Sequence, residues 1–296
     1  MESPAAPARS YLFAPASHVR RRERAFDCGA DAVILDLEDA VAADEKTAAR
    51  AAVAELLATP RPTPAWVRVN GTESPWCFAD LEAVAGPGLA GVVLPKAERP
   101  DQLTSLDWVL GQLEHRAGLG PGTIGMMALV ETAVGVERLG ELARATPRLT
   151  RLGFGIADYS LDLGLDAGDD EAGIAYVRAR LVHVSRAAGL QPPVDSVVVQ
   201  VREAARFRDS AARARRLGLF GKLCIHPDQV PLANEIFAPT PAEVEWARAV
   251  VLAFEAAQRA GSAAIQVDGE FVDYPVVARA RAMLALAERL QIRAGA

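Results

Sequence analysis

Charged side chains recur at the ends of apolar segments in this sequence, and their types and spacing are what could do chemistry. Asp36, Glu38 and Asp39 follow one apolar run within four positions. Three carboxylates this close repel one another unless cations neutralise them, so we expect cationic partners. Arg68 lies inside another apolar run, two residues before Asn70. A buried guanidinium requires an anion, which is either a structural carboxylate or the carboxylate of a substrate.

Two further acids, Glu131 and Asp158, follow later apolar runs. Each one alone could simply be an acid at the start of a helix, where the helix dipole favours negative charge. As a pair on neighbouring strands they are more informative, because two hard carboxylates with room for waters are typical of a Mg²⁺ site. Closely spaced His and Cys ligands are absent from the sequence, which argues against Zn²⁺.

Lys96 and His226 also follow apolar runs. Lys96 could pair locally with Glu98 or bind an anion. His226 is more often an ordinary histidine at the rim of a site than a base, although its usual pKa would permit base catalysis. The arginine-rich stretches 20–24 and 206–216 fall on expected helices, where a solvated face is the default and contact with ligand phosphates is the alternative.

The elements that must position these residues alternate between short apolar runs and helix-like segments. Near-continuous hydrophobicity is typical of parallel strands covered on both faces. Eight runs favour an α/β fold of the (β/α)8 TIM barrel type, with a doubly wound sheet as the alternative. In such a barrel the charged residues would converge on the rim at the carboxyl ends of the strands. The eight expected strands are 11–14, 32–37, 66–69, 91–94, 126–130, 152–156, 197–201 and 222–225.

Helix signals divide the chain into a barrel, 1–230, and a C-terminal extension, 231–296. Within the barrel we expect helices over 100–115, 134–145 and 202–217, the last ending at Gly218. In the extension, Thr240 to Glu243 reads as a capping box with proline at the first helical position. A short apolar stretch, 263–267, and a final helix from about Pro275 follow.

Composition excludes several classes of protein. With 51% hydrophobic and 24% charged residues, the 296-residue chain is neither disordered nor fibrous. A net charge of −6 argues against a nucleic-acid binder that relies on a basic surface. Three scattered cysteines suit buried thiols in a reducing cytoplasm, and no apolar run approaches the roughly 18 residues that a membrane span needs. We therefore expect a cytoplasmic protein with no membrane or nucleic-acid partner.

Seven motifs, taken in order, resemble those of the citrate lyase β-subunit-like branch of the HpcH/HpaI aldolase family. The resemblance extends from about Arg9 to the C-terminus, and the joint order of the motifs is far more specific than any one of them. Two departures are Ala16, where the family usually has glycine, and the segment 196–202, where Gln200 and Arg202 replace family residues. The motifs occupy 9–15, 29–41, 68–71, 94–96, 130–133, 155–159 and 221–227.

The resemblance implies a (β/α)8 barrel in homotrimers or dimers of trimers. It implies an enzyme that uses Mg²⁺, or Mn²⁺, to make or break a carbon–carbon bond between an acyl-thioester enolate and an oxo acid, with citryl-, malyl- or citramalyl-CoA as substrates. By motif, Glu131 and Asp158 would be the metal ligands, and Arg68 would hold the substrate near the thioester carbonyl. Asp273 would be an acid that reaches the active site of a neighbouring subunit; its alternative is a helix N-cap before Pro275.

The remaining site candidates complete this hypothesis. We take Glu38 as a further catalytic candidate, and the substrate-binding candidates besides Arg68 are Asp36, Asp39, Asn70, Lys96 and His226. Two other functions stay open at this point. One is a metal-dependent pyruvate-type class II aldolase without CoA, and the other is an accessory lyase subunit that needs a separate acyl-carrier partner.

Overall fold

Seven of the eight apolar segments form one sheet, and neighbouring strands in it pair in parallel. Their order is β6-β5-β4-β3-β2-β1-β7, so six consecutive strands are followed by the last one against β1. The runs are rich in Val, Ile and Leu, which favour strands buried on both faces. The strands are β1 (Ser10–Pro15), β2 (Ala32–Asp36), β3 (Ala65–Arg68), β4 (Leu89–Leu94), β5 (Gly125–Val130), β6 (Leu149–Phe154) and β7 (Lys222–Cys224).

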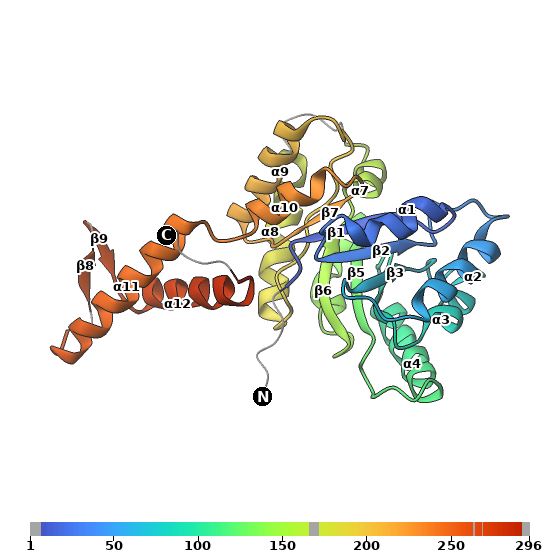
Figure 1. The fold of residues 1–296 in the computed structure, drawn as a ribbon, viewed down its shortest axis with the longest axis horizontal. Coiled ribbons are helices and arrows are strands. Elements are labelled where there is room, and N and C mark those ends of the chain that lie inside the picture. Colours follow the sequence, from blue (N-terminus) through green and yellow to red (C-terminus); the bar gives the residue numbers. More distant parts are fainter. Residues whose placement is uncertain (1–6, 166–171, 263, 268, 292–296) are drawn as a thin grey trace. The chain divides into compact units, whose positions relative to one another are not determined.

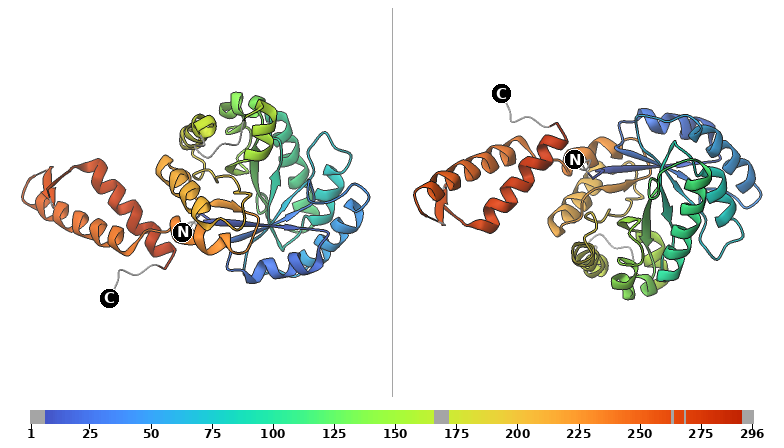
Figure 2. Two further views of the ribbon diagram at one scale, coloured as in Figure 1. Left: turned by 90° about the horizontal axis from the view of Figure 1, so that it is seen from above. Right: turned by 90° about the horizontal axis from the view of Figure 1, so that it is seen from below.

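The computed structural model describes residues 7–165, 172–262, 264–267 and 269–291. The chain divides into two compact units, one over Pro7–Glu235 and one from Ile236 onward. In the first unit the sheet curls, and its helices lie around the outside (Figures 1 and 2). These helices are α1 (Val19–Arg24), η1 (Ala25–Asp27), α2 (Lys46–Leu57), α3 (Cys77–Val84), α4 (Pro100–Arg116), α5 (Ala133–Glu137), α6 (Leu139–Leu142), α7 (Ile156–Leu163), α8 (Ala172–Ala187), α9 (Ala204–Leu217) and α10 (Gln229–Ile236).

The predicted strand over 197–201 is wrong. Its place between β6 and β7 is taken by two single-residue parallel bridges, Gly153 to Val194 and Asp195 to Lys222. Asp195 is fully buried and accepts a hydrogen bond of 2.5 Å from Lys222 Nζ. The apolar run comes just after this point and leaves Val199 58% exposed. A buried ion pair, rather than an apolar run, therefore marks the position between the two edge strands.

The core on one face of the sheet comes from alternate residues of successive strands. Ala32 and Ile34 of β2, and Met127 and Leu129 of β5, belong to one buried cluster. Residues two apart on a strand share a face, so the residues between them turn toward the helices. The cluster is completed by Tyr11, Val93, Val194 and Leu223. This alternation gives the sheet two buried faces, as its composition predicts.

Two expected helices have their predicted ends. Helix α4 begins at Pro100, and α9 ends before Gly218, whose φ of 98° is the left-handed conformation expected of a C-terminal cap. The expected helix over 134–145 is instead two short helices, α5 and α6, interrupted at Arg138. Gly135 and Gly140 lie in this run, and glycine lowers helix stability by about 1 kcal/mol relative to alanine.

The C-terminal unit contains two helices, α11 (Pro241–Arg259) and α12 (Tyr274–Arg289), and an antiparallel pair, β8 (Ile265–Val267) with β9 (Glu270–Val272). Thr240 and Glu243 form the predicted capping box. The helices pack through an apolar cluster that contains Val250, Phe254 and Val277. Among the described residues of the whole chain, none of the helices is long and apolar enough to span a membrane.

Candidate functional site

Five predicted site residues stand at or just after the carboxyl ends of consecutive strands. Asp36 and Arg68 are the last residues of β2 and β3, and they are paired in the strand register. Lys96 follows β4, Glu131 directly follows β5, and Asp158 lies in the first turn of α7 after β6. Because parallel strands end at the same edge of a sheet, these side chains converge there. Hydrogen bonds and ion pairs connect them to one another.

Arg68 is held by carboxylates of the β2–α2 loop. Its Nε and Nη2 donate to the two oxygens of Asp36 at 2.8 and 2.6 Å, and Nη1 lies 2.8 Å from Glu38 Oε2. Burial alone would lower the pKa of Arg68, but the hydrogen bonds to Asp36 raise it above its usual value. Of the two anions considered from sequence, a structural carboxylate is therefore present. Nε and Nη2 thus hydrogen-bond to Asp36, whereas Nη1 makes an ion pair with Glu38 and no hydrogen bond to it.

Lys96 contacts acids of the β2–α2 loop, of the loop after β5, and of helix α7. Its backbone N–H donates to Glu131 Oε1 at 2.7 Å, and its ammonium donates to Glu38 Oε1 at 2.7 Å. The same ammonium lies 3.5 Å from both Asp39 Oδ2 and Asp158 Oδ1. Burial opposes the charge, yet the hydrogen bond to Glu38 raises the pKa of Lys96 above its usual value. These long-range partners replace the local pairing that the sequence left open.

Glu131 is a buried carboxyl group, only 2% exposed. Burial, and then the neighbouring charge of Asp158, raises its pKa to about 7, although the backbone N–H of Lys96 acts in the opposite direction. Gly155 packs directly against the Glu131 side chain. A Cβ atom at position 155 would lie 2.1 Å from Glu131 Oε2 and 2.7 Å from Glu131 Cβ. Only glycine fits at this position while Glu131 stays where it is.

Ser196 is a functional-site residue that sequence reasoning missed. Its Oγ accepts a hydrogen bond of 2.8 Å from the backbone N–H of Ile156, at the start of α7. Ser196 is 1% exposed and lines the same cavity as Asp158. It therefore fixes the turn that presents Asp158. The signal available from the sequence was a single serine beside an apolar run, which by itself is typical of many loops.

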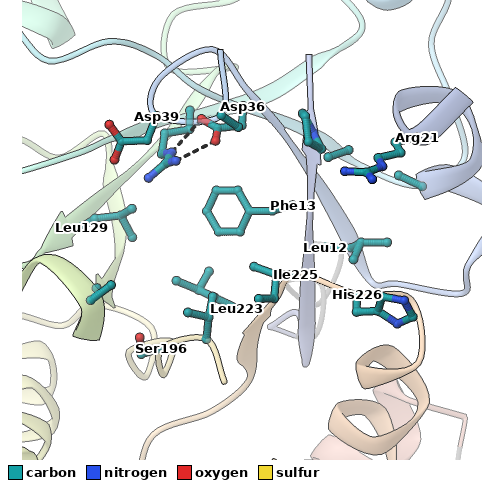
Figure 3. A pocket seen from close by; sticks show the side chains of 18 of the residues that line it. Leu12, Phe13, Arg21, Asp36, Asp39, Leu129, Ser196, Leu223, Ile225 and His226 are labelled. Carbon is teal, nitrogen blue, oxygen red and sulfur yellow. Dashed lines mark hydrogen bonds and ion pairs between the residues drawn. The ribbon is translucent and has the colours of Figure 1, made fainter. Parts of the chain in front are cut away.

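A cavity of about 630 Å³ opens at this edge of the sheet. Figure 3 shows Phe13 extending into it between Asp36 and Leu129. The ring of Phe13 lies 5.1 Å from the Arg68 guanidinium, which is the geometry of a cation–π contact. The volume is in the range of small-molecule sites. Among its charged lining residues are Arg20, Arg21, Arg24, Asp36, Asp39, Arg68, Glu131, Asp158 and His226.

The arginine stretch 20–24 thus contributes to the cavity as well as to the surface. Arg20, Arg21 and Arg24 are exposed on α1 and line the cavity, whereas Arg22 is buried and donates from Nη1 to the carbonyl of Ala16 at 2.5 Å. Figure 3 shows Arg21 on the same side of the cavity as Leu12. Three cations at the mouth of one cavity can bind an anionic group such as a phosphate.

Asn70 points away from this cavity into a buried network. Its Nδ2 donates to the Leu37 carbonyl at 3.0 Å and to Asp80 Oδ2 at 2.6 Å, and its Oδ1 accepts from Lys46 Nζ at 2.7 Å. The same ammonium donates to the carbonyls of Leu37 and Glu38, both at 2.6 Å. Asn70 is thus placed to support the β2–α2 loop, and Lys46 is a second residue that sequence reasoning missed.

His226, Glu38 and Asp273 lie in different surroundings. His226 lines the cavity, and its Nδ1 accepts from the backbone N–H of Asp228 at 3.3 Å. Glu38 has one oxygen on Arg68 and the other on Lys96, and burial raises its pKa. Asp273 belongs to the C-terminal unit, where its side chain accepts from Val276 N at 3.4 Å and caps α12. The alternative reading of Asp273 as an N-cap is therefore realised.

Glu131 and Asp158 supply two carboxylates rather than a complete cage. In the described part of the chain, no group of three or more His, Cys, Asp or Glu side chains is arranged to hold a metal ion. Mg²⁺ usually keeps several waters and is bound by one or two carboxylates, so a pair suits it. The buried Glu131, with its pKa raised beside Asp158, is a donor that a cation would stabilise as the anion. The donor set fits a hard divalent ion.

This chain is similar to one family of known proteins. The model of the family HpcH/HpaI aldolase/citrate lyase matches residues 9–227. Citrate lyase subunit beta of Escherichia coli (strain K12) is 36% identical over 287 residues, which cover 96% of this chain and 95% of that protein. The (3S)-malyl-CoA thioesterase of Cereibacter sphaeroides (strain ATCC 17029) is 37% identical, with 98% of each chain covered.

A solved structure agrees with these sequence matches. The protein CitE from Mycobacterium tuberculosis, in complex with magnesium, acetoacetate and coenzyme A, is 32% identical. It superposes with a TM-score of 0.77 over 96% of this chain and 99% of that one. Its fold is thus shared across both units of the present chain.

Proposed function

The chain belongs to the HpcH/HpaI aldolase/citrate lyase family, and from this premise we propose that it is a Mg²⁺-dependent carbon–carbon lyase acting on a 3-hydroxyacyl thioester. Citryl-, malyl- and citramalyl-CoA are the candidate substrates, and the products would be an acetyl-type thioester and an oxo acid. The observation that carries the proposal is the meeting of Glu131, Asp158 and Arg68 at one cavity. The relatives named as citrate lyase subunit beta and malyl-CoA thioesterase support the substrate class.

Glu131 and Asp158 would hold the Mg²⁺, which supplies a Lewis acid and a template for the oxygens of the acid half of the substrate. Mn²⁺ has the same preference for oxygen ligands and could replace it. The magnesium in the related CitE structure supports this assignment. The remaining chemistry falls to side chains of this chain.

In cleavage, a base takes the hydroxyl proton, the carbon–carbon bond breaks, and its electron pair passes to the thioester carbonyl. Arg68 is placed to stabilise the enolate oxygen that forms, because it lines the cavity and its five N–H groups exceed its two hydrogen bonds to Asp36 and its ion pair with Glu38. A preorganised donor of this kind contributes about 3–4 kcal/mol. Asp36 and Glu38 act as positioning residues that fix the guanidinium. Lys96, Asp39 and His226 remain candidates for contact with the substrate.

The three arginines of α1 support a CoA thioester over a free oxo acid. Arg20, Arg21 and Arg24 line the same cavity as the proposed metal ligands. Phosphate groups bind readily to clustered arginines, so these side chains would hold the phosphates of the carrier. A pyruvate-type aldolase without CoA would have no carrier phosphates for these arginines to bind.

The direct test uses the purified chain, Mg²⁺ and a panel of thioesters. We expect cleavage of malyl- or citramalyl-CoA, loss of cleavage with EDTA, and recovery with Mg²⁺ or Mn²⁺. Glu131→Ala and Asp158→Ala should abolish turnover and keep the far-UV circular dichroism spectrum; full activity in both would refute the metal assignment. Cleavage of free 4-hydroxy-2-oxo acids only would refute the thioester. Activity that requires an added acyl-carrier partner would favour the accessory-subunit alternative, which the citrate lyase relatives also suggest.

Thioester hydrolysis is a second candidate, favoured by the 37% identity to (3S)-malyl-CoA thioesterase over 98% of each chain. The two reactions give different products from malyl-CoA. A lyase releases acetyl-CoA and glyoxylate, whereas a thioesterase releases malate and free CoA. Chromatography of the CoA products, with a thiol reagent to count free CoA, separates them.

Asp273 is our candidate for the acid that protonates the enolate carbon, acting in the active site of a neighbouring subunit of a homotrimer or a dimer of trimers. Because Asp273 also caps α12, its two roles need different variants. Asn caps a helix as well as Asp does but is no acid, and Ala does neither, at a cost of about 1 kcal/mol. We expect Asp273→Asn to keep the melting temperature and lose turnover.

Subunit mixing tests whether Asp273 acts across an interface. Asp273→Asn and Glu131→Ala are both expected to be inactive alone, but oligomers reassembled from the two would contain some sites with both native residues. Partial recovery of activity supports a shared site, and its absence in verified mixed oligomers refutes it. The same oligomers, sized by light scattering, test the trimer.

The finer fold assignment is also a proposal. We propose that the ring of strands is a closed (β/α)8 barrel, with Val194 and Asp195 in the eighth position. The two single-residue bridges between β6 and β7 support it. The barrel, 1–230, would carry the catalysis and the extension, 231–296, the oligomer contacts. Free cysteines at Cys28, Cys77 and Cys224 suit a reducing, cytoplasmic location.

A further inference from the structure

Lys96 has an unusual backbone conformation. Its φ of 48° lies in the left-handed region, and the only other non-glycine residue there, among the described residues, is Gln291 near the C-terminus. A left-handed lysine is disfavoured by roughly 1–2 kcal/mol, so the surrounding contacts must hold it. Strain of this kind often marks a residue with a positional task.

The conformation lets one residue contact acids of two loops and of helix α7 at once. The backbone N–H of Lys96 reaches Glu131, while its ammonium reaches Glu38, Asp39 and Asp158. The contact with Glu38 is short, 2.7 Å, and the contacts with Asp39 and Asp158 are looser, 3.5 Å each. The ammonium therefore forms a close ion pair with Glu38 and a longer one with Asp158.

Charge balance explains why an internal cation is needed there. Five carboxyl groups meet at this edge of the sheet, from Asp36, Glu38, Asp39, Glu131 and Asp158, and within the described residues their side-chain ion pairs are with Arg68 and Lys96. Arg68 is taken up by the first two acids. Asp158 thus forms its ion pair with the Lys96 ammonium. A divalent cation shared by Glu131 and Asp158 would approach the same ammonium.

We propose that Lys96 is a built-in counter-ion that holds Asp158 in the metal-free protein and releases it when a divalent cation binds, while staying paired with Glu38. This rests on the proposed metal site. Two like charges cannot share Asp158 at close range without repulsion. Lys96 therefore stabilises the empty site and weakens the binding of the divalent ion, which keeps the metal exchangeable.

The test measures metal binding and stability, neither of which depends on turnover. Mn²⁺ is the probe, because the signal of the free aquo ion in electron paramagnetic resonance counts the unbound metal. Lys96→Met removes the charge and keeps the length of the side chain, and Lys96→Arg keeps the charge. Arg208→Gln is the matched control, since Arg208 is an exposed cation paired with Glu235 on the surface. Thermal unfolding is followed with EDTA and with saturating Mn²⁺.

We expect Lys96→Met to bind Mn²⁺ about threefold more tightly or better, from the loss of one positive charge a few ångströms from the ion. Lys96→Arg and Arg208→Gln should bind as the wild type does. In EDTA, Lys96→Met should melt below both, and saturating Mn²⁺ should narrow that gap without closing it, because the pair with Glu38 stays lost. Equal or weaker Mn²⁺ binding by Lys96→Met overturns the inference while leaving the metal site standing. Failure of the wild type to bind Mn²⁺ at millimolar concentration refutes the metal site itself.

Discussion

Gly155 offers a sharp test of how the site is built, because one methyl group there acts directly on Glu131. A Cβ atom at Gly155 would lie 2.1 Å from Glu131 Oε2, 2.7 Å from its Cβ and 3.1 Å from its Cδ. Rotating the carboxylate would relieve the first contact but not the second, since the Cβ of Glu131 moves only with its backbone. Gly155→Ala therefore has to push Glu131 away bodily, by roughly 1 Å to restore ordinary contacts.

The expected magnitude follows from that shift. A misplacement of about 1 Å in a catalytic group lowers activity by about 100-fold. Overpacking lowers the free energy of unfolding by about 1–3 kcal/mol, partly offset by the 0.4–1 kcal/mol that Gly to Ala gains through the unfolded chain. Gly86→Ala is the control, because a Cβ at Gly86 meets nothing within 4 Å.

The assay compares the two variants by thioester cleavage, by Mn²⁺ affinity and by urea unfolding. Gly155→Ala should lose activity and Mn²⁺ affinity together and remain folded, whereas Gly86→Ala should match the wild type in both. Wild-type Mn²⁺ affinity and turnover in a folded Gly155→Ala protein would refute the reasoning, because Glu131 would then have no fixed place in the site.

Two further predictions concern the framework around the site. Lys46→Met should lower the free energy of unfolding by about 1–3 kcal/mol in urea titrations, since it removes three buried hydrogen bonds and takes the donor from the Asn70 amide oxygen, while the Leu37 and Glu38 carbonyls keep one partner each; an unchanged midpoint would contradict it. Burial would raise the pKa of Glu114, but hydrogen bonds from Arg148 and from backbone N–H groups lower it overall. Its contribution to stability is therefore present above the unfolded-state pKa, about 4.3, and is lost as pH falls through the lower folded-state value. Urea unfolding at pH 7, 5, 4 and 3.5 should show this loss in the wild type and a smaller one in Glu114→Gln; equal slopes would exclude Glu114 as its source.

Much of the site could be predicted from sequence because parallel strands impose it. Once the apolar runs are read as strands, the residues after each run must gather at one edge. Asp36, Arg68, Lys96, Glu131 and Asp158 do so. The prediction needed no knowledge of which residues touch, only of where each strand ends. Asn70 also follows a strand end, but its side chain hydrogen-bonds to the framework, and its contact with the substrate stays a prediction.

The run over 197–201 shows the limit of apolar patterning. Its valines have high strand propensity, yet the residues that bridge β6 and β7 are Val194 and Asp195. Asp195 accepts from Arg178 at 2.8 Å as well as from Lys222, and both cations are distant in the sequence. A hydropathy pattern cannot reveal a strand position that a buried network of charged residues stabilises. Each charged residue of such a network has the hydropathy of a surface residue.

Contacts between residues that are distant in the sequence could not be predicted from the sequence either. The contact of Gly155 with Glu131 joins two loops, and that of Ser196 with Ile156 joins two more. In sequence, a glycine after a strand and a serine in a loop have many ordinary explanations. Only the folded arrangement shows that one makes space for a carboxylate and that the other fixes the turn before Asp158.

Two lysines hold the β2–α2 loop in different ways. Their variants can therefore distinguish an effect on stability from an effect on metal binding. Lys46 is buried and holds the backbone carbonyls of Leu37 and Glu38, whereas Lys96 is 42% exposed at its side chain and holds the Glu38 carboxylate. Loss of Lys46 removes three buried hydrogen bonds whatever is bound, so its cost should persist with saturating Mn²⁺. Loss of Lys96 takes a counter-ion from both Glu38 and Asp158, and a divalent cation on Glu131 and Asp158 would neutralise the second of these. The two Lys→Met variants should therefore respond differently to added metal: the stability defect of the Lys96 variant becomes smaller and that of the Lys46 variant does not change.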